Sequence, residues 1–376
     1  MKSLKESPKA YILILDYNNW WDTIECLESV LRNDYTNYQV IVIDNGSPNN
    51  SMDYIKAWAE GRLNVWVAPD NPLRNLSYPP VRKPIPYIYY TKYEAEKGGD
   101  PEKEKKLEDV VRNNNTITTQ YPLIFVQTGT NLGFAGGNNV GIRYARSKCS
   151  FEYVWLLNND TVIKSDALTQ VMCRMQEKPN AGICGSTLLF YHEPGKIWAQ
   201  GGATYNKWFA LPKCIGCFWR TDRMVDVEYV ESKMNYVAGA AMLISRSFLD
   251  NIGLMSEDYF LYFEEIDWST RARGRYTLAY APDSIVYHKV GRSISGSVSD
   301  YYSIRNRLVF TRKFFPLSLP TVCLGLLVLV FNRIRKWQWD RMWMFLKIAI
   351  NLQSNKIRHK LSLYHKVFDH KRKIYR

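Results

Sequence analysis

A short acidic cluster has the residue types and spacing needed to move a proton. Glu264, Glu265 and Asp267 fall within four residues, and aromatic residues from Phe260 to Trp268 surround them. Neighbouring like charges and apolar surroundings both disfavour the ionised carboxyl group, so they raise its pKa towards that of a useful general base. The alternative is an acidic first turn of a helix, which the helix dipole stabilises.

A second set of residues has the types that hold a hard divalent cation. Asn158, Asn159 and Asp160 follow the apolar run Tyr153–Leu157, and amide and carboxylate oxygens are the ligands that such a cation prefers. The imidazole of His288 could complete a metal site. Asn and Asp are also ordinary turn residues, and a single histidine often has a structural role.

The elements that must position these groups alternate between strand and helix. Apolar runs typical of strands buried in a parallel sheet are Ala10–Leu15, Tyr38–Ile43 and Val65–Ala68. Apolar residues at helical spacing separate them over Trp21–Arg32 and Met52–Ala59. This order predicts a right-handed parallel α/β unit.

Two aspartates mark the edge of this unit where a ligand is expected. Asp16 and Asp44 directly follow the first two runs, and parallel sheets bind ligands at the carboxyl ends of their strands. The small residues between Gly133 and Asn139 would let backbone approach the same ligand. That stretch lacks the spacing of a dinucleotide-binding loop and of a P-loop, so those classes lose support.

From residue 70 to 121 the alternation is interrupted by a stretch rich in proline and charge. We expect an inserted excursion with one short helix, Pro101–Val111. Further elements are then expected as strand Leu123–Gln127, a helix through Gly141–Arg146, strand Tyr153–Leu157, helix Ile163–Met175, paired strands in Ala181–Phe190, strand Asn235–Ser245, a loop and helix in Asp258–Arg273, and strands Leu278–Tyr280 and Ile285–His288.

Positive charge is concentrated at the C-terminal end of the chain. The net charge is +14, yet residues 301–376 hold 17 basic and two acidic residues, so the rest is close to neutral. The uncharged stretch Phe314–Phe331 contains Pro316 and Pro320, which favours an interfacial helix over a membrane span. Such a tail suits an anionic membrane surface, and the alternatives are a helical pair packed on the body or nucleic-acid binding.

Composition excludes several other classes. With 46% hydrophobic and 23% charged residues, neither a polytopic membrane protein nor a disordered chain fits. Seven scattered cysteines argue against a disulfide scaffold, and Cys214 and Cys217 form a C-x-x-C without a second pair, which disfavours a zinc ribbon. No nucleophile-elbow motif is present, and the polar N-terminus gives no expectation of a signal peptide.

Several segments, in their order along the chain, carry a resemblance to a known family. They are YILILDYNNWWDTIECLESVL, VIVIDNGSPNNS, TNLGFAGGNNVGIRYA, YVWLLNNDTVI, NYVAGAAMLISR, YFLYFEEIDWSTRARG, YHKVGRSISG and YYSIRNRLVF. The sequence resembles the inverting family 2 glycosyltransferases with a GT-A-type fold, and among them the bacterial rhamnosyltransferase-like enzymes. The resemblance covers about Lys9 to Phe314. It implies a nucleotide-sugar donor and attack by an acceptor hydroxyl with inversion at the anomeric carbon.

The resemblance also implies roles for particular residues. Glu265 matches the family's catalytic aspartate, with Glu264 as its alternative and Asp267 beside them. The D-x-D metal motif falls on Asn158–Asp160, where its first Asp is Asn, and His288 matches a metal-binding histidine; these residues would hold Mg²⁺ or Mn²⁺. The nucleotide-sugar set is Asp16, Tyr17, Asn18, Asp44, Asn131, Gly136, Gly137, Asn138, Asn158 and Arg292. The acceptor set is Gly239, Ala240 and Trp268, although Trp268 could equally belong to the core.

We therefore predict an α/β protein with two parts. Residues 1–300 form a GT-A-type domain with a mixed, mostly parallel sheet and the excursion 70–121, and residues 301–376 form a helical, membrane-associating region. The predicted activity is metal-dependent transfer of a hexose, by resemblance from dTDP-rhamnose, to a hydroxyl of a glycan, polyprenyl-linked acceptor in cell-surface polysaccharide synthesis. The predicted location is cytoplasmic, at the inner face of the cell membrane, without a nucleic-acid partner. A non-catalytic sugar-binding or polyanion-binding protein is the alternative; a sugar-nucleotide pyrophosphorylase would need a basic, glycine-rich loop after the first strand.

Overall fold

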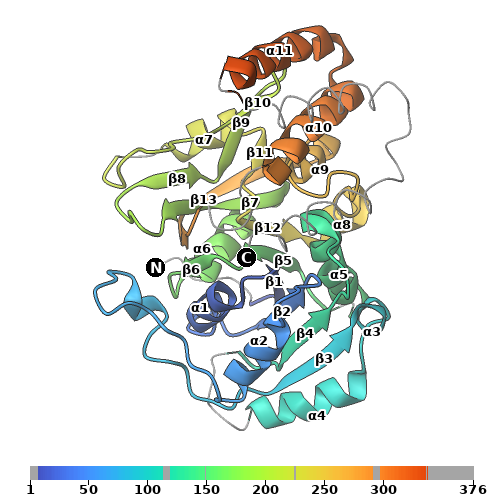
Figure 1. The fold of residues 1–376 in the computed structure, drawn as a ribbon. Coiled ribbons are helices and arrows are strands. Elements are labelled where there is room, and N and C mark those ends of the chain that lie inside the picture. The colour runs from blue at the N-terminus through green and yellow to red at the C-terminus, as the bar shows by residue number, and fades with distance from the viewer. Residues whose placement is uncertain are drawn as a thin grey trace. The chain divides into compact units, whose positions relative to one another are not determined.

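The structure is a computed structural model that describes residues 7–112, 119–148, 150–223, 226–290, 297–335 and 337. The chain divides into two compact units. The first comprises Met1–Asn206 and Leu211–Ile294, and the second comprises Lys207–Ala210 and Ser295–Arg376. Each unit is described separately below (Figure 1).

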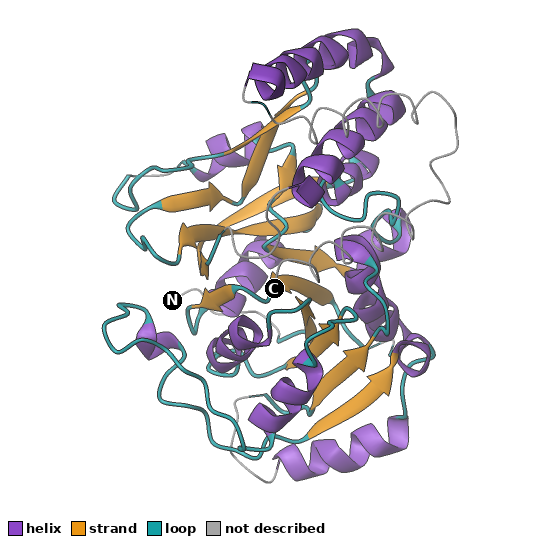
Figure 2. Ribbon diagram, in the orientation of Figure 1, coloured by secondary structure: helices purple, strands orange, loops and turns teal. Residues whose placement is uncertain are grey.

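A mixed sheet, ten-stranded in the described residues, forms the centre of the first unit (Figure 2). Its order is β3-β4-β2-β1-β5-β12-β7-β13-β6, with β8 beside β7. The strands are β1 (Ala10–Asp16), β2 (Tyr38–Asp44), β3 (Tyr87–Thr91), β4 (Leu123–Gln127), β5 (Tyr153–Asn158), β6 (Thr161–Ile163), β7 (Ala181–Phe190), β8 (Ile197–Gln200), β12 (Ala241–Ser245) and β13 (Thr277–His288). Pairing is parallel from β3 to β5 and between β7 and β13, and antiparallel around β12. The predicted mixed, mostly parallel sheet is confirmed.

A smaller sheet pairs β10, β9 and β11 in that order. Its strands are β9 (Gly202–Asn206), β10 (Leu211–Cys214) and β11 (Tyr236–Val237). Cys214 and Tyr236 both pair with Ala203, so the three residues lie in one row across the sheet. This sheet therefore places β9 between β10 and β11, and β11 leads through Ala238–Ala240 into β12.

Helices cover both faces of the large sheet (Figure 1). The helices of the first unit are α1 (Trp20–Val30), α2 (Ser51–Ala59), η1 (Arg74–Leu76), α3 (Lys92–Glu96), α4 (Pro101–Arg112), α5 (Gly133–Ser147), α6 (Ala167–Glu177), α7 (Val227–Lys233), α8 (Arg246–Ile252) and α9 (Glu264–Ala272). Side chains alternate along β1, so Ile12 and Ile14 pack with α1, α2 and α6, while Tyr11 and Leu13 pack with α5. Two apolar layers result, and burial on both faces explains why the strands are continuous apolar runs.

The edge of the sheet differs from the sequence prediction. Val65–Ala68 is not a strand; Val65 and Val67 are buried in extended chain without a ladder partner of their own. The edge strand is instead β3, inside the stretch predicted to be an excursion, and it pairs in parallel with β4. Apolar content alone does not distinguish a buried extended segment from a strand, because the difference is hydrogen bonding to a partner. The helix predicted at Pro101–Val111 is confirmed as α4.

Three further predicted elements have different boundaries. Ala181–Phe190 is one strand, β7, and not a pair. The two short strands predicted at Leu278–Tyr280 and Ile285–His288 are parts of one strand, β13, whose pairing with β7 shifts in register between Ala281 and Ile285. The strand predicted over Asn235–Ser245 is divided into β11 and β12 by Ala238–Ala240. The break matters for function, because it forms a loop beside α9.

The second unit contains α10 (Ser297–Phe314), η2 (Pro316–Ser318) and α11 (Leu319–Arg335). The Phe310 ring packs in a tilted arrangement against Phe314, at 4.9 Å between ring centroids, and against Phe315, at 5.8 Å, near the turn between the helices. The hydroxyl of Thr321 donates to the main-chain oxygen of Trp208. Among the described helices, none has the length and apolar character needed to cross a membrane.

Candidate active site

The carboxyl ends of three neighbouring strands gather residues that the sequence predicts to bind a nucleotide sugar. β1 runs parallel to β2 on one side and to β5 on the other, with Asp16 beside Asp44 and Leu15 beside Asn158. Asp16, Asp44 and Asn158 therefore lie at one edge of the sheet. This is the edge at which parallel α/β sheets bind their ligands.

Asp16 is buried and connects this edge to α1. Its Oδ1 accepts hydrogen bonds from Thr23 Oγ1 at 2.8 Å and from Asn159 Nδ2 at 3.0 Å. Its Oδ2 accepts one from Ser47 Oγ at 3.2 Å. Burial raises the pKa of Asp16 to about 6, although the hydrogen bonds from Thr23 and Ser47 oppose the rise. Asp16 thus fixes the relative positions of the loops after β1, β2 and β5.

The other predicted nucleotide residues surround the same turn. Asp44 is buried, and its Oδ1 accepts a hydrogen bond from the main-chain nitrogen of Ser47 at 2.8 Å. The hydroxyl of Ser47 accepts one from the Asn18 nitrogen at 2.8 Å, and Asn18 has a left-handed backbone with φ of 61°. Tyr17 is exposed. Asp16, Tyr17, Asn18 and Asp44 are therefore brought together as predicted.

Asp160 and His288 also meet, although 128 positions separate them in the sequence. β6 pairs with β13, which places His288 beside Thr161. His288 Nε2 lies 3.2 Å from Asp160 Oδ1, and both side chains are buried. The Trp198 ring meets the imidazole edge-on at 4.9 Å and limits its rotation.

This pair fits a divalent cation. Two adjacent ligands in an octahedral shell at about 2.1 Å lie about 3 Å apart, close to the separation seen here. His288 Nδ1 is buried without a hydrogen-bond partner in the described residues. The described residues contain no cluster of three or more His, Cys, Asp or Glu that could hold a metal, so other ligands must complete the shell. Asn158, the third predicted metal ligand, donates its main-chain nitrogen to the Ala240 oxygen at 3.0 Å. Arg292, a predicted nucleotide-sugar contact, lies outside the described residues.

A buried ion cluster beside this pair was not foreseen. Lys289 Nζ contacts Asp22 and Glu25 of α1, and its main-chain nitrogen donates to the Asp160 oxygen at 2.9 Å. All three charged side chains are almost fully buried. The sequence signal was present: acidic residues at 22, 25 and 28 recur every three positions on an otherwise apolar helix, although their buried partner is distant in the chain.

The same helix anchors the first part of the excursion. Glu25 Oε1 accepts hydrogen bonds from Tyr191 at 2.6 Å and Ser77 at 3.3 Å. Glu28 accepts them from Lys83 Nζ and the Val81 nitrogen, both at 2.7 Å. Residues 77–83 are therefore fixed to α1 through buried carboxylates.

Glu264 and Glu265 begin α9 and have the environment expected of a catalytic pair. Glu264 is almost completely buried, and its Oε2 has no hydrogen-bond partner in the described residues. Burial, and then the charge of Glu265, raise the pKa of Glu264 well above its usual value. Burial raises the pKa of Glu265 to about 7, and its side chain is half-buried. Desolvation thus outweighs the favourable start of the helix at both positions.

The loop that leads into this pair has an unusual backbone. Phe260, Tyr262 and Phe263 have positive φ angles of 64°, 67° and 76°. Left-handed backbone costs free energy for residues other than glycine, on the order of 1 kcal/mol or more each, and is found most often at functional sites. The Phe260 oxygen accepts a hydrogen bond from the Phe134 nitrogen at 2.7 Å, which holds the loop against α5. No pattern in the sequence predicted this strained backbone.

A short series of contacts connects the acidic pair to the metal ligands. A Cβ atom built on Gly239 would lie 2.1 Å from Glu265 Oε1, so the carboxylate rests against this glycine. The next residue, Ala240, accepts a hydrogen bond from the Asn158 nitrogen at 3.0 Å. Asp160 follows two residues later. Glu265 therefore lies against Gly239, and the neighbouring Ala240 is bonded to the chain that leads to Asp160.

Two residues of α9 have structural environments instead. Asp267 is fully buried and accepts hydrogen bonds from Tyr259 at 2.9 Å and Arg271 Nε at 2.7 Å. This pairing suits a structural ion pair better than the predicted catalytic role. Trp268 is fully buried and donates to the Gly253 oxygen at 2.8 Å. The expectation that Trp268 stacks on an acceptor sugar is wrong, because its ring belongs to the core.

The glycine-rich stretch also has a different role from the predicted one. It forms the first turns of α5, where the glycines allow the helix to approach neighbouring chain: a Cβ on Gly137 would lie 2.5 Å from Leu15, and one on Gly136 would lie 2.8 Å from Leu132. Asn138 donates to the Phe134 oxygen within the helix at 3.0 Å. Asn131 accepts from the Gly133 nitrogen at 2.9 Å. Packing and helix initiation thus give these four residues a structural role, and their contact with a nucleotide stays a prediction.

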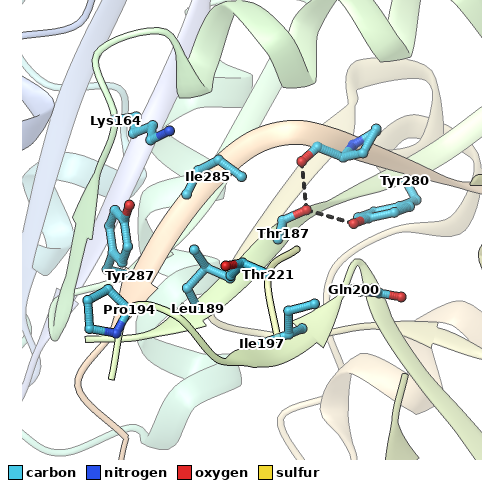
Figure 3. A pocket seen from close by; sticks show the side chains of 11 residues that line it. Lys164, Thr187, Leu189, Pro194, Ile197, Gln200, Thr221, Tyr280, Ile285 and Tyr287 are labelled. Atoms are coloured by element: carbon cyan, nitrogen blue, oxygen red, sulfur yellow. Dashed lines mark hydrogen bonds between the residues drawn. The ribbon is translucent and has the colours of Figure 1, made fainter. Parts of the chain in front are cut away.

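A cavity of about 300 Å³ lies elsewhere, over β7, β8 and β13 (Figure 3). Leu189, Ile197 and Tyr287 are among its lining residues, and Thr187 is hydrogen-bonded at 2.7 Å to both the Tyr280 hydroxyl and the Pro282 oxygen. None of the predicted site residues lines this cavity.

Comparison with known proteins identifies the family. The model of glycosyl transferase family 2 matches residues 11–71 and 105–253, and the chain belongs to this family. The fold is of the GT-A type: a mannosyltransferase from Pyrobaculum calidifontis, solved with GDP-Man and Mn²⁺, superposes with a TM-score of 0.50 over 94% of this chain and 89% of that chain at 13% identity. The sequence-based recognition of the family and fold is confirmed.

Curated relatives act on several glycans. The low-salt glycan biosynthesis hexosyltransferase Agl10 of Haloferax volcanii is 25% identical over 53% of this chain and 63% of its own. The poly-beta-1,6-N-acetyl-D-glucosamine synthase of Staphylococcus epidermidis is 25% identical over 64% and 56%. The dTDP-rhamnosyl transferase RfbF of Shigella flexneri is 22% identical over 54% and 70%. The chain thus spans less than two thirds of the first two relatives.

Proposed function

We propose that the protein transfers a sugar from a nucleoside diphosphate to a hydroxyl of a glycan acceptor, with inversion at the anomeric carbon. One observation carries the proposal: Glu265, whose pKa is raised to about 7, lies against Gly239. The next residue, Ala240, is hydrogen-bonded to Asn158 at the end of β5, two residues before Asp160, which lies beside His288. A base and a diphosphate-binding pair on opposite sides of one loop suit attack from the side opposite the leaving group.

Glu265 is the proposed general base. A carboxyl group with a pKa of about 7 is ionised in a substantial fraction of molecules near neutral pH and still accepts a proton readily. It would take the proton of the acceptor hydroxyl as that oxygen attacks the anomeric carbon. Burial, and then the charge of Glu265, also raise the pKa of Glu264 beside it.

Asp160 and His288 are the proposed ligands of Mg²⁺ or Mn²⁺. A divalent cation supplies Lewis-acid stabilisation of the charge that develops on a diphosphate leaving group. The ion cluster of Lys289, Asp22 and Glu25 would keep the Asp160 main chain in place, since the Lys289 nitrogen is bonded to it. Asp16 and Asp44 would contact the nucleoside from the ends of β1 and β2.

For the donor we propose dTDP-rhamnose, and for the acceptor a polyprenyl-linked glycan of a cell-surface polysaccharide. The name of RfbF supports the donor, and the glycan-synthesising relatives support the acceptor class. A donor that binds only the folded protein raises its unfolding free energy by about 2.7 kcal/mol at a hundred times its Kd. Thermal unfolding with dTDP-rhamnose, UDP-N-acetylglucosamine and GDP-mannose, each with and without Mn²⁺, therefore tests donor choice.

Product analysis then tests the reaction. NMR of the product formed from the stabilising donor should show the anomeric configuration opposite to that of the donor. Retained configuration would contradict the role of Glu265 as a general base. If no donor stabilises the protein and none is consumed, the proposed enzymatic function is contradicted.

We further propose that the second unit associates with the inner face of the cell membrane in the cytoplasm. Leu324, Leu327, Val328 and Phe331 of α11 are exposed and recur at the spacing of one helical face. Exposed Trp208 and Phe209 belong to the same unit, and residues 301–376 carry a strong positive charge. An apolar face with basic surroundings suits a helix lying in an anionic interface.

Vesicle sedimentation tests this association. Binding should be strong to vesicles containing phosphatidylglycerol, weak to pure phosphatidylcholine, and reduced in the variant with Leu324 and Leu327 both changed to Ser. The matched control changes Val110 and Tyr229, exposed apolar residues of the first unit, to Ser. Equal binding by both variants, or preference for duplex DNA at equal salt, would contradict a membrane surface.

A further inference from the structure

The Glu265 carboxylate occupies the space where a side chain at position 239 would begin. A Cβ on Gly239 would lie 2.1 Å from Oε1, 3.0 Å from Cδ and 3.2 Å from Cγ of Glu265. These distances are too short for van der Waals contact between carbon and these atoms. The side chain of Glu265 therefore packs along the bare Cα of Gly239.

Gly239 is needed here for space and not for backbone conformation. Its φ lies outside the left-handed region, unlike that of Gly133, whose φ is +74°. An alanine at 239 is thus compatible with the backbone, and the conflict is with Glu265 alone among its near neighbours.

The loop around Gly239 is held on both sides. The Ala238 nitrogen donates to the Gly201 oxygen at 3.1 Å, and the Ala240 oxygen accepts from the Asn158 nitrogen at 3.0 Å. Because the backbone is bonded on each side of residue 239, an added methyl group displaces the flexible end of Glu265 before it displaces the loop.

We propose that Gly239 is a positioning residue, whose missing side chain sets where the Glu265 carboxylate lies. The inference rests on the proposed function, in which Glu265 is the base. It replaces the sequence expectation that Gly239 leaves room for an acceptor sugar, since Glu265 takes that room. An aspartate at 265 is shorter by one carbon–carbon bond, about 1.5 Å, and would withdraw from a methyl group at 239.

A double-mutant cycle tests the inference. Gly239→Ala should lower kcat at least tenfold with little change in the KM of donor or acceptor, while Glu265→Asp also lowers kcat because its carboxylate falls short. The double variant should be within about twofold of Glu265→Asp, because the methyl group no longer meets the side chain. Gly195→Ala is the matched control, since its Cβ would enter open space. Donors are dTDP-rhamnose, UDP-N-acetylglucosamine and GDP-mannose in parallel.

A crystal structure of Gly239→Ala gives a second result that does not depend on the donor. The Glu265 carboxylate should be displaced by more than about 1 Å, and it should keep its place in Gly195→Ala. If Gly239→Ala fails to fold, recovery of folding by adding Glu265→Asp supports the inference, and failure of both variants overturns it.

The inference and the proposed function fail differently. An unmoved carboxylate, an equal loss from Gly239→Ala in both backgrounds, or a rise in acceptor KM instead of a fall in kcat overturns the positioning role. Full activity of Glu265→Asp and Glu265→Gln removes Glu265 from the proposed mechanism, and no turnover of any donor by the unmodified protein overturns the proposed function itself.

Discussion

Two groups of buried acidic residues flank the Gly239–Ala240 loop, and they are built in opposite ways. We call the first group the metal end, after the proposed role of Asp160 and His288. Its Asp160 carboxylate lies 3.2 Å from the imidazole of His288, and the neighbouring Lys289 contacts the carboxylates of Asp22 and Glu25. In the second, the base end (Glu264 and Glu265), two adjacent acids share apolar surroundings, and Glu264 has an oxygen without a hydrogen-bond partner in the described residues.

The difference shows how one fold gives carboxylates different chemistry. At the metal end, Lys289 compensates the burial of Asp22 and Glu25, and Asp160 lies against the imidazole of His288. This arrangement suits the proposed binding of a cation. At the base end, burial is not compensated, so the pKa of both glutamates rises and one becomes suited to accept a proton near neutral pH. Asp267, three residues after Glu264, is paired with Arg271 and falls outside this group.

The largest expected effect comes from removing the charge at the base end. Glu265→Gln should lower kcat on the order of a thousandfold, because general-base catalysis contributes roughly 10² to 10⁴. Donor affinity measured by calorimetry should stay nearly unchanged, since the base contacts the acceptor. Glu228→Gln, at the exposed start of α7, is the control. Turnover of Glu265→Gln at the unmodified rate would remove Glu265 from the mechanism.

At the metal end, the largest effect should be on stability. Lys289→Met leaves Asp22 and Glu25 buried without their cation, and breaking a buried ion pair on one side costs about 3–5 kcal/mol. Urea unfolding monitored by tryptophan fluorescence should show a lower midpoint with an unchanged slope. Lys103→Met removes an exposed ion pair with Asp100 and should leave the midpoint close to its original value. An unchanged midpoint in Lys289→Met would mean that the cluster is not as buried as described.

A smaller loss, on the order of a hundredfold in kcat/KM, is expected from Asp160→Asn, because a metal ion supplies several kcal/mol of charge stabilisation. EDTA should abolish activity of the unmodified protein, and Mn²⁺ or Mg²⁺ should restore it. Titration of Mn²⁺ by electron paramagnetic resonance should show weaker binding to Asp160→Asn. Full activity in excess EDTA would remove the metal from the proposed mechanism.

The elements that hold these two ends were predictable to different degrees. β1, β2, β5 and α1 were predicted within one or two residues, because continuous apolar runs and helical spacing depend on local sequence. β3 was missed, because a strand at a sheet edge is defined by pairing with β4, whose sequence is more than 30 residues away. The break after β11, at Ala238–Ala240, was missed for a similar reason. Ala238 and Ala240 are hydrogen-bonded to Gly201 and Asn158, which lie far from them in the chain.

The sequence predictions of site residues rest on residue type and position. Asp16, Asp44, Asp160, His288 and Glu265 were singled out because they lie at strand ends or at a helix start, and the structure brings Asp16 beside Asp44 and Asp160 beside His288. The glycines of α5 and Trp268 were given binding roles that packing explains instead, since small and aromatic residues serve cores as well as ligands. The Lys289 cluster and the role of Gly239 depend on contacts between distant segments. The acidic residues at 22, 25 and 28 indicate one side of the cluster, but no spacing identifies Lys289 as their partner.

The smallest and most diagnostic effect should be in the pH dependence. Because Glu265 must be ionised to accept a proton, kcat/KM should rise tenfold per pH unit below about 7 and level off above it. Two groups near Glu265 titrate above this range, because burial raises the pKa of Cys214 on β10 to about 11 and raises that of Tyr236 on β11 above its usual value. The pKa of Glu264 is also raised, so the pH profile reports the two glutamates as a pair.

Asp16 is the remaining buried acid with a pKa near this range, at about 6. Asp16→Asn should lower kcat/KM at all pH values yet keep the limb near 7, because Glu265 is unaffected. If kcat/KM instead levels off above about pH 4.5, the ordinary pKa of a carboxyl group, the Glu265 carboxyl group is hydrated in solution. The contrast between compensated and uncompensated burial would then not distinguish the two ends of the site.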